Sequence, residues 1–337
     1  MFQDKYLLHK RQANNTSDRL RTIALDVTNR CNMSCSHCYA SVFKQQPDVD
    51  LEYLRKFTQE AYDLGVFHYV LQGGEAILEF DRLKSIIEMI HPKETYINVV
   101  SNGWEMDIHK IRELKALDVD KICYSLDSGF AAEHDANRMV GAFKRVIDAV
   151  KMTTAEGLHS AVSTVVLHKT IEQDSFKKVL EIGRELQVRV EIQVAMPVGK
   201  WDGIRDIRIT PDEASQLKGI FESNGNLPNG QRHIGRDIYD CNGIDHCPAG
   251  QNFMAVSASG EIFPCNFCQY TLGNIKDTSL AEARAALLTS KWFQGTHPCC
   301  LLGEDDEFFD KYVTPNVDRI RPLDAYKLFD LKVENDK

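Results

Sequence analysis

Short β-branched runs alternate with longer amphipathic stretches through the first two thirds of this 337-residue chain, and no other feature constrains its fold as strongly. Such alternation builds a parallel sheet with crossover helices. Helices are predicted where apolar residues recur every three or four positions, as over Leu51–Leu64 and Phe143–Glu156. The six predicted strands are Thr22–Thr28, His68–Gln72, Tyr96–Ser101, Lys121–Asp127, Ala161–Leu167 and Val188–Met196. We therefore predict an α/β fold, a partial (β/α)6 barrel.

The length of the chain predicts one large domain and one smaller domain. A stretch rich in Gly, Asn and Pro around Asn224–Gly230 is typical of a linker before the cysteine-rich end. An acidic and then aromatic run, Gly303–Phe309, predicts a solvated helix start with a packing face, or a surface that recruits substrate. The predicted parts are an N-terminal extension (1–20), the barrel (21–223), a linker (224–235), a cysteine-rich domain (236–305) and a tail (306–337).

Composition argues against several classes of partner. A net charge of −9 disfavours a surface that neutralises nucleic-acid phosphates or anionic lipid. The chain has no apolar run of about 18 residues, and its start lacks the apolar core of a signal peptide. We therefore expect a cytoplasmic protein with no nucleic-acid or membrane partner. Its ten cysteines then stay reduced and bind metal or do chemistry instead of forming disulfides.

Three cysteines, Cys31, Cys35 and Cys38, follow the first predicted strand. Catalytic groups of α/β barrels lie on loops at the carboxyl ends of the strands, so this position fits a site. A four-iron cluster held by three thiolates keeps one iron without a protein ligand, and that iron can bind substrate. The alternative is a zinc site completed by His37 or by a distant residue.

The motif Cys-x-x-x-Cys-x-x-Cys after the first strand of a βα series resembles that of the radical S-adenosylmethionine (SAM) enzymes. In that family the open iron is chelated by SAM, and one electron cleaves the sulfonium to methionine and a 5′-deoxyadenosyl radical. The resemblance covers residues 20–305 of this chain. It implies SAM and a 4Fe-4S cluster as cofactors, and an electron donor such as flavodoxin or ferredoxin as a partner.

Further motifs lie where the family has them. Gln72–Glu75 resembles the "GGE" motif, in which glycines let backbone carbonyls approach the SAM ammonium. Ser101–Gly103 resembles a polar turn near SAM, although both motifs, taken alone, are typical of ordinary turns. Ser125 and Asp127 share a strand face with Cys123 and resemble the Ser-x-Asp segment that bonds SAM. The implied cofactor-binding residues are Tyr39, Gln72, Gly73, Gly74, Glu75, Ser101, Asn102, Ser125 and Asp127, and Asp127 is also a catalytic candidate.

The run that follows, with His134, Asp135 and Arg138, resembles the subgroup that includes sulfatase maturases and ribosomal-peptide maturases. Without that resemblance, His134 and Asp135 are typical of a helix start or a surface pair. Sulfatase maturases carry an aspartate as base beside the position of Cys265, and this chain has Asn266, which cannot take a proton. Sulfatase maturation is therefore disfavoured.

The spacing from Cys247 through Gly260 to Cys265 resembles the SPASM or twitch extension of radical SAM enzymes. Alternating apolar residues around Ser257–Gly260 predict a hairpin that brings the two thiols together. The family's further cysteine run for a second auxiliary cluster is absent, so a twitch-like domain with one 4Fe-4S cluster is favoured, with a zinc knuckle as the alternative. The predicted ligands of that cluster are Cys241, Cys247, Cys265 and one of Cys299 and Cys300.

Cys268 is left over in this scheme and is a candidate catalytic hydrogen-atom donor, because an S–H bond is weaker than most C–H bonds. Donation to a substrate radical inverts a stereocentre without net oxidation. Its alternative roles are a cluster ligand or a small buried hydrophobe. Without a donor, the auxiliary cluster could accept the second electron and leave a dehydrogenated or cross-linked product.

Taken together, the resemblance implies a radical SAM oxidoreductase, epimerase or maturase of natural product biosynthesis that acts on a peptide or natural-product substrate. Only about twenty residues precede the first strand, too few for the leader-binding module of many peptide maturases. A small-molecule dehydrogenase or epimerase acting on a sugar or cyclitol therefore remains an alternative. A remote alternative is a non-catalytic binding protein with loops stapled by zinc.

Overall fold

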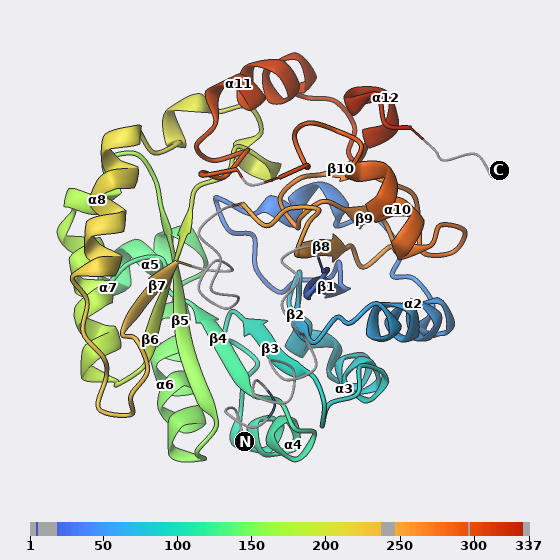
Figure 1. Cartoon of the computed structure of the whole chain (residues 1–337). Coiled ribbons are helices and arrows are strands. Elements are labelled where there is room, and N and C mark those ends of the chain that lie inside the picture. The colour runs from blue at the N-terminus through green and yellow to red at the C-terminus, as the bar shows by residue number, and fades with distance from the viewer. Residues whose placement is uncertain (1–4, 6–18, 237–246, 296, 333–337) are drawn as a thin grey trace.

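The structure, a computed structural model, describes residues 5, 19–236, 247–295 and 297–332. Its main sheet has the strand order β7-β6-β5-β4-β3-β2-β1-β8-β9, and β1 to β6 all pair in parallel with their neighbours in sequence (Figure 1). The predicted partial (β/α)6 barrel is therefore confirmed. Its strands are β1 (Thr22–Thr28), β2 (His68–Gly73), β3 (Tyr96–Ser101), β4 (Lys121–Ser125), β5 (His159–Val166) and β6 (Arg189–Val194).

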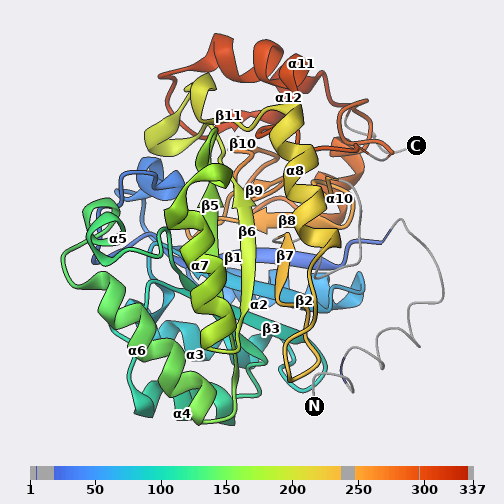
Figure 2. The same ribbon diagram turned by 90° about the vertical axis from the view of Figure 1, so that its left-hand side faces the viewer.

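Helices cover the outer face of this sheet (Figure 2). In α6 (Ala142–Ala155) the buried residues Val146, Ala149, Val150 and Thr153 form one stripe, which packs on the strands because it follows the helical period. The other helices of the barrel are α2 (Leu51–Asp63), α3 (Phe80–Met89), α4 (Ile108–Ala116), α5 (Ala131–Asn137), α7 (Asp174–Glu185) and α8 (Pro211–Glu222).

Part of the predicted linker is a strand. Residues Ile234–Arg236 form β7, which pairs in parallel with β6, and Ile234 is buried against the barrel. Three residues with a central glycine are too few to show strand alternation, so β7 has no signal in the sequence. The predicted linker, 224–235, thus overlaps a strand at its carboxyl end, and its boundaries stay a prediction. The predicted N-terminal extension lies mostly outside the described residues.

The cysteine-rich region continues the barrel sheet. Strands β8 (Phe253–Val256) and β9 (Ile262–Phe263) form the predicted antiparallel hairpin, and β8 also pairs in parallel with β1. The turn contains Gly260 at φ +94°, a backbone conformation that favours glycine. In α10 (Leu280–Leu287) the first backbone N–H groups donate to the Glu60 carboxylate of α2. This hydrogen bonding fixes the cysteine-rich region to the outside of the barrel.

The tail folds onto the same region, which confirms the predicted helix start with a packing face. Phe308 is fully buried and packs against Trp292, Tyr312 and Phe329, while Asp306 pairs with Arg208.

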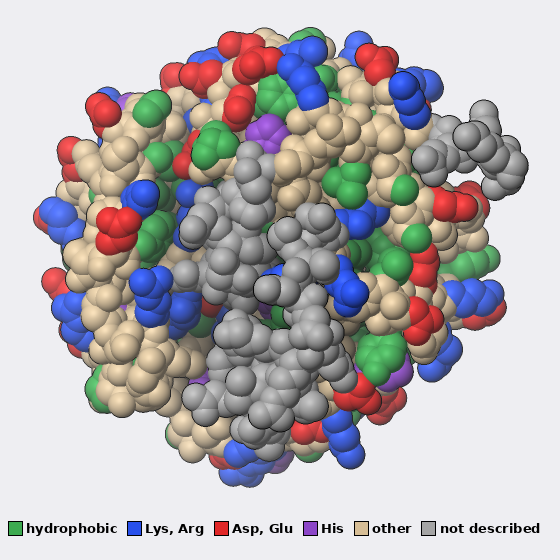
Figure 3. Space-filling model, viewed as in Figure 1, with side chains coloured by type: hydrophobic (Ala, Val, Ile, Leu, Met, Phe, Trp, Pro, Cys, Tyr) green, Lys and Arg blue, Asp and Glu red, His purple; other side chains and the backbone are tan. Residues whose placement is uncertain are grey.

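No helix in the described ranges is long and apolar enough to cross a membrane. Acidic and basic side chains are interspersed around the rim of the face in Figure 3. The remaining elements are β10 (Tyr270–Thr271), α11 (Asp306–Phe308), β11 (Leu323–Asp324) and α12 (Ala325–Phe329).

We expect Phe308→Ala to destabilise the protein by about 3–5 kcal/mol, because it removes a buried ring and leaves a cavity among aromatic neighbours. Urea unfolding of anaerobically prepared protein measures this change. Ile320 is 92% exposed, so Ile320→Ala is the matched control and should change the free energy of unfolding by less than about 0.5 kcal/mol. Equal stability of the two variants would contradict the observed packing of the tail.

Candidate functional site

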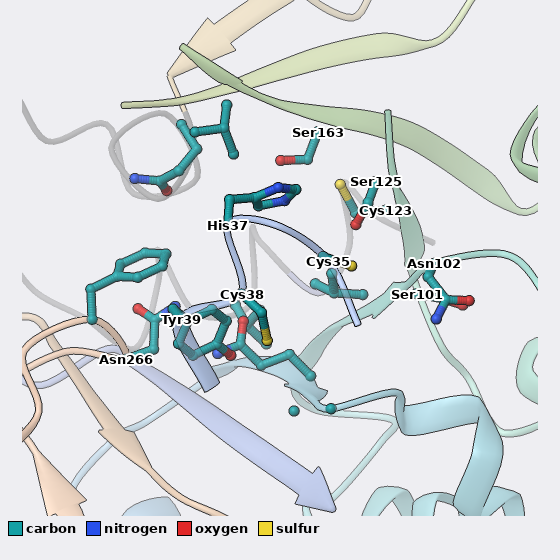
Figure 4. Close-up of a pocket in the computed structure, with 18 of the residues that line it drawn as sticks. Cys35, His37, Cys38, Tyr39, Ser101, Asn102, Cys123, Ser125, Ser163 and Asn266 are labelled. Carbon is teal, nitrogen blue, oxygen red and sulfur yellow. The ribbon is translucent and has the colours of Figure 1, made fainter. Parts of the chain in front are cut away.

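A cavity opens at the carboxyl ends of the barrel strands, with about 1390 Å³ of empty space including its mouth. The three thiols of the cysteine triplet and all nine predicted cofactor-binding residues line it, and Figure 4 shows several of them converging from different strands. Asn266 and Phe267 from the cysteine-rich region line the same space. The sequence prediction that these residues lie together is confirmed. Their individual binding roles stay predictions.

The loop that carries the triplet is held by distant segments. The Lys200 ammonium donates to the backbone carbonyl of Ser34 (3.0 Å), and the backbone N–H of Ser36 donates to the carbonyl of Asn137 (3.0 Å). A Cβ on Gly199 would lie 2.3 Å from the carbonyl oxygen of Cys38, so only glycine permits this approach. Segments after β6 and at the end of α5 thus position the three thiols.

The two glycines of the GGE segment are needed for backbone packing. Gly73 has φ +133°, and a Cβ on Gly74 would lie 2.2 Å from the carbonyl oxygen of Arg30. The N–H groups of Gly74 and Glu75 donate to the carbonyls of Thr28 (2.8 Å) and Arg30 (2.9 Å). The end of β2 is therefore fixed to the segment that leads into Cys31. This contact gives a reason for the glycines that does not depend on the expected approach of SAM.

The carboxylate of Glu75 holds the turn after β3. It accepts hydrogen bonds from the Ser101 hydroxyl (2.8 Å) and from the backbone N–H groups of Asn102 (2.7 Å) and Ile77 (3.2 Å). Glu75 is 2% exposed, and burial raises the pKa of its carboxyl even though these donors favour the ionised form. Its position explains how β2 and β3 present their polar ends to one cavity.

Asp127 forms a buried ion pair with Arg138. Both carboxylate oxygens of Asp127 accept from the guanidinium at 2.7 Å, which is a bidentate arrangement. Burial alone would raise the pKa of Asp127, but the charges of Arg138 and His37 outweigh it and hold that pKa at about 2. Another guanidinium nitrogen of Arg138 lies 3.9 Å from the Cys35 sulfur. The cation is placed to offset negative charge on the thiolates of a bound cluster.

Arg138 is not among the predicted site residues, although the run from His134 to Arg138 was a signal for it. The inner face of the barrel also carries polar residues that are not among the predicted site residues. Asn98, Ser163 and Glu191 line the cavity from β3, β5 and β6. In β6 the sequence carries a signal, because Arg189, Glu191 and Gln193 are polar residues at every second position, whereas β3 and β5 have no such repeat.

Asp26 on β1 lies behind this lining. Its carboxylate accepts from the Gln72 amide (3.2 Å) and the Tyr39 hydroxyl (3.4 Å), two side chains that do line the cavity. Burial raises the pKa of Asp26 to about 7, although these two hydrogen bonds oppose the shift. Asp26 therefore orients two predicted cofactor-binding residues.

A second, smaller cavity is lined by Cys247, Cys265 and Cys300, three of the predicted auxiliary ligands. The backbone N–H of Cys247 donates to the carbonyl of His297, which brings the segment just before Cys299 back to the hairpin. Cys299 does not line this cavity, and Cys241 lies outside the described residues. The side chains common to the walls of both cavities are Gln193, Val194, Met196, Phe253 and Phe267.

Cys268, the candidate hydrogen-atom donor, is 2% exposed and does not line the main cavity. Its backbone N–H donates to the carbonyl of Cys265, and its thiol lies in the field of Cys265, Cys247 and Cys300. Its neighbours are thus the predicted auxiliary ligands.

The donor sets fit two iron–sulfur clusters, because the triplet Cys31, Cys35 and Cys38 borders the main cavity and three other cysteines border the second. Burial raises the pKa of Cys31 to about 11 and that of Cys265 to about 12, so these thiols become ligands only when metal binding displaces their protons. Among the described residues, no three His, Cys, Asp or Glu side chains are grouped to hold a single metal ion.

The amide oxygen of Asn266 is buried in the main cavity wall without a partner in the described chain, as expected of a group that meets a ligand.

Two family models match this chain. The Radical SAM superfamily matches residues 25–182, and the iron-sulfur cluster-binding domain SPASM matches residues 247–300. The chain therefore contains a radical SAM domain followed by a C-terminal SPASM domain. SAM and a 4Fe-4S cluster belong to the first domain, and auxiliary iron–sulfur binding belongs to the second.

The chain is similar to an AdoMet-dependent heme synthase of Methanosarcina barkeri, with 25% identity over 78% of this chain and 81% of that protein. It is also 25% identical to the subtilosin biosynthesis protein AlbA of Bacillus subtilis, over 81% of this chain and 61% of AlbA. The crystal structure of Streptococcus suis SuiB bound to the precursor peptide SuiA shares the fold, with a TM-score of 0.62 and 14% identity over 87% of this chain and 70% of SuiB.

We expect Glu75→Ala to weaken SAM binding by about 1–3 kcal/mol, because it leaves buried donors of the β3 turn without an acceptor. Glu75→Gln should lose less, since its amide oxygen still accepts. Calorimetry on anaerobically reconstituted protein measures both, with the exposed Glu88→Ala on α3 as control. An affinity that is the same in Glu75→Ala and in the control would contradict the role given to this carboxylate.

Proposed function

We propose that this radical SAM protein abstracts a hydrogen atom from a peptide or another natural product held in the main cavity. One observation carries the proposal: a single cavity is lined by the cysteine triplet, by the ends of β2 to β4 and by Asn266 and Phe267 of the SPASM region. A substrate in this space touches both domains. The polar inner face of the barrel supplies hydrogen-bonding groups that an apolar core would lack.

When bound, the cofactor supplies a primary carbon radical that can abstract hydrogen from unactivated C–H bonds. Cys31, Cys35 and Cys38 would hold its cluster, and Arg138 would offset their charge. Glu75 keeps the turn at Ser101 in place. Apolar walls that include Phe253 and Phe267 limit the access of water. A flavodoxin or ferredoxin would deliver the electron, and the need for reduced thiols favours a cytoplasmic location.

A peptide substrate is supported by the similarity to AlbA, which is named for subtilosin biosynthesis. A small-molecule substrate is the second candidate. It is supported by the heme synthase similarity, because this chain spans 81% of that protein and only 61% of AlbA.

The mass of the product in deuterated water separates the reaction types: epimerisation adds one mass unit to the substrate, whereas dehydrogenation or cross-linking removes two. Mass spectrometry of candidate peptides and small molecules, with SAM and reductant, is the test.

We expect the triple variant Cys31→Ala, Cys35→Ala, Cys38→Ala to form no 5′-deoxyadenosine from SAM under reducing conditions, while it still binds iron at the auxiliary site. Liquid chromatography of the products and an iron assay measure these two properties. Continued formation of 5′-deoxyadenosine by this variant would show that the triplet does not hold the cluster that cleaves SAM. Zinc in place of iron after reconstitution of the wild type would favour the non-catalytic zinc protein instead.

A further inference from the structure

Cys123 is the one cysteine of the sequence outside both the triplet and the C-terminal group. It lies on β4, two residues before Ser125 and on the same inward face, and it lines the main cavity although it is only 2% exposed. Figure 4 shows it on the same side of the cavity as Ser125. A thiol is thus part of the wall of the proposed reaction space.

This thiol has a carboxylate neighbour. The sulfur of Cys123 donates to an oxygen of Glu191 on β6 (3.4 Å), and Glu191 is itself 2% exposed and lines the cavity. The other oxygen of Glu191 pairs with the Lys121 ammonium and lies 3.7 Å from the Arg189 guanidinium. Burial would raise the pKa of Glu191, but these charges outweigh burial and lower it. Because an ionised carboxylate only accepts, the proton stays on the sulfur.

A second observation indicates that a ligand reaches this wall. Asn98, on the neighbouring strand β3, is 3% exposed and lines the same cavity. Its amide oxygen has no hydrogen-bond partner within the described chain, and the same holds for Asn266 across the cavity. Buried amide oxygens are seldom left without donors, so this part of the cavity is suited to a ligand that carries N–H or O–H groups.

We propose that Cys123 donates a hydrogen atom to carbon radicals formed in this cavity, and this inference rests on the proposed function. The S–H bond breaks homolytically, a C–H bond forms, and the sulfur is left as a thiyl radical. One electron from the iron–sulfur or flavin protein that reduces the enzyme, together with one proton, restores the thiol. Glu191 and Lys121 form the chain that brings the proton. Rotation about the Cβ–Sγ bond turns the hydrogen from Glu191 toward the cavity.

The first test needs SAM, dithionite and deuterated water, with no substrate and no added thiol. The radical derived from SAM then takes an atom from the cavity wall, and wild-type 5′-deoxyadenosine should carry one deuterium. In Cys123→Ser the O–H bond is too strong to donate, so the label should be lost. The readout is the deuterium content per molecule of 5′-deoxyadenosine, which does not depend on how much product forms.

If the 5′-deoxyadenosine formed by Cys123→Ser still carries deuterium, the inference is overturned. If Cys268→Ala forms unlabelled 5′-deoxyadenosine while Cys123→Ser forms the labelled product, Cys268 is the donor. If the wild type forms unlabelled 5′-deoxyadenosine, only the Cys123 inference fails. If the wild type forms no 5′-deoxyadenosine at all, the proposed function itself is contradicted.

The second test needs no turnover. The infrared difference spectrum between wild type and Cys123→Ser should contain an S–H stretching band, and this band should shift in Glu191→Gln, because the acceptor of the hydrogen bond loses its charge. A difference spectrum without an S–H band would mean that Cys123 is ionised or bound to metal, and this result would also overturn the inference.

Discussion

The buried carboxylate of Glu75 is the contact on which the site depends. It ties the end of β2 to the turn after β3, while the glycines before it let β2 run against Thr28–Arg30. Cys31 follows directly, so the position of the thiol loop is set by the same contact. A carboxylate with three donors in a buried place is stable only when all three are present, which makes this end of the sheet rigid.

The SPASM region completes the site because its hairpin continues the barrel sheet. The pairing of β8 with β1 fixes the hairpin beside the first strand, and Asn266 and Phe267 follow the hairpin into the cavity wall. The same wall separates this cavity from the one lined by Cys247, Cys265 and Cys300. A ligand in the main cavity would therefore meet the triplet on one wall and, on another, side chains that also line the second cavity.

The sequence predicted the barrel strands to within about two residues, because they are short runs rich in β-branched residues and their ends carry turn residues. It missed β7, whose three residues pair only because β6 is already in place. It also missed the polar inner face. Asn98 is not part of a repeat of polar residues, and Glu191 is held by Lys121 and Cys123, which lie far away in the sequence. The glycines of the GGE segment were located correctly, but their packing against Arg30 is a tertiary contact.

The proposed function requires that the triplet holds a cluster that binds SAM, while a second cluster does not bind it. The electron paramagnetic resonance spectrum of reduced protein, recorded with and without SAM, tests it most directly. We expect two cluster signals, of which one changes its g values when SAM is added and the other does not. A spectrum in which SAM changes neither signal would show that the triplet holds no cluster that binds SAM.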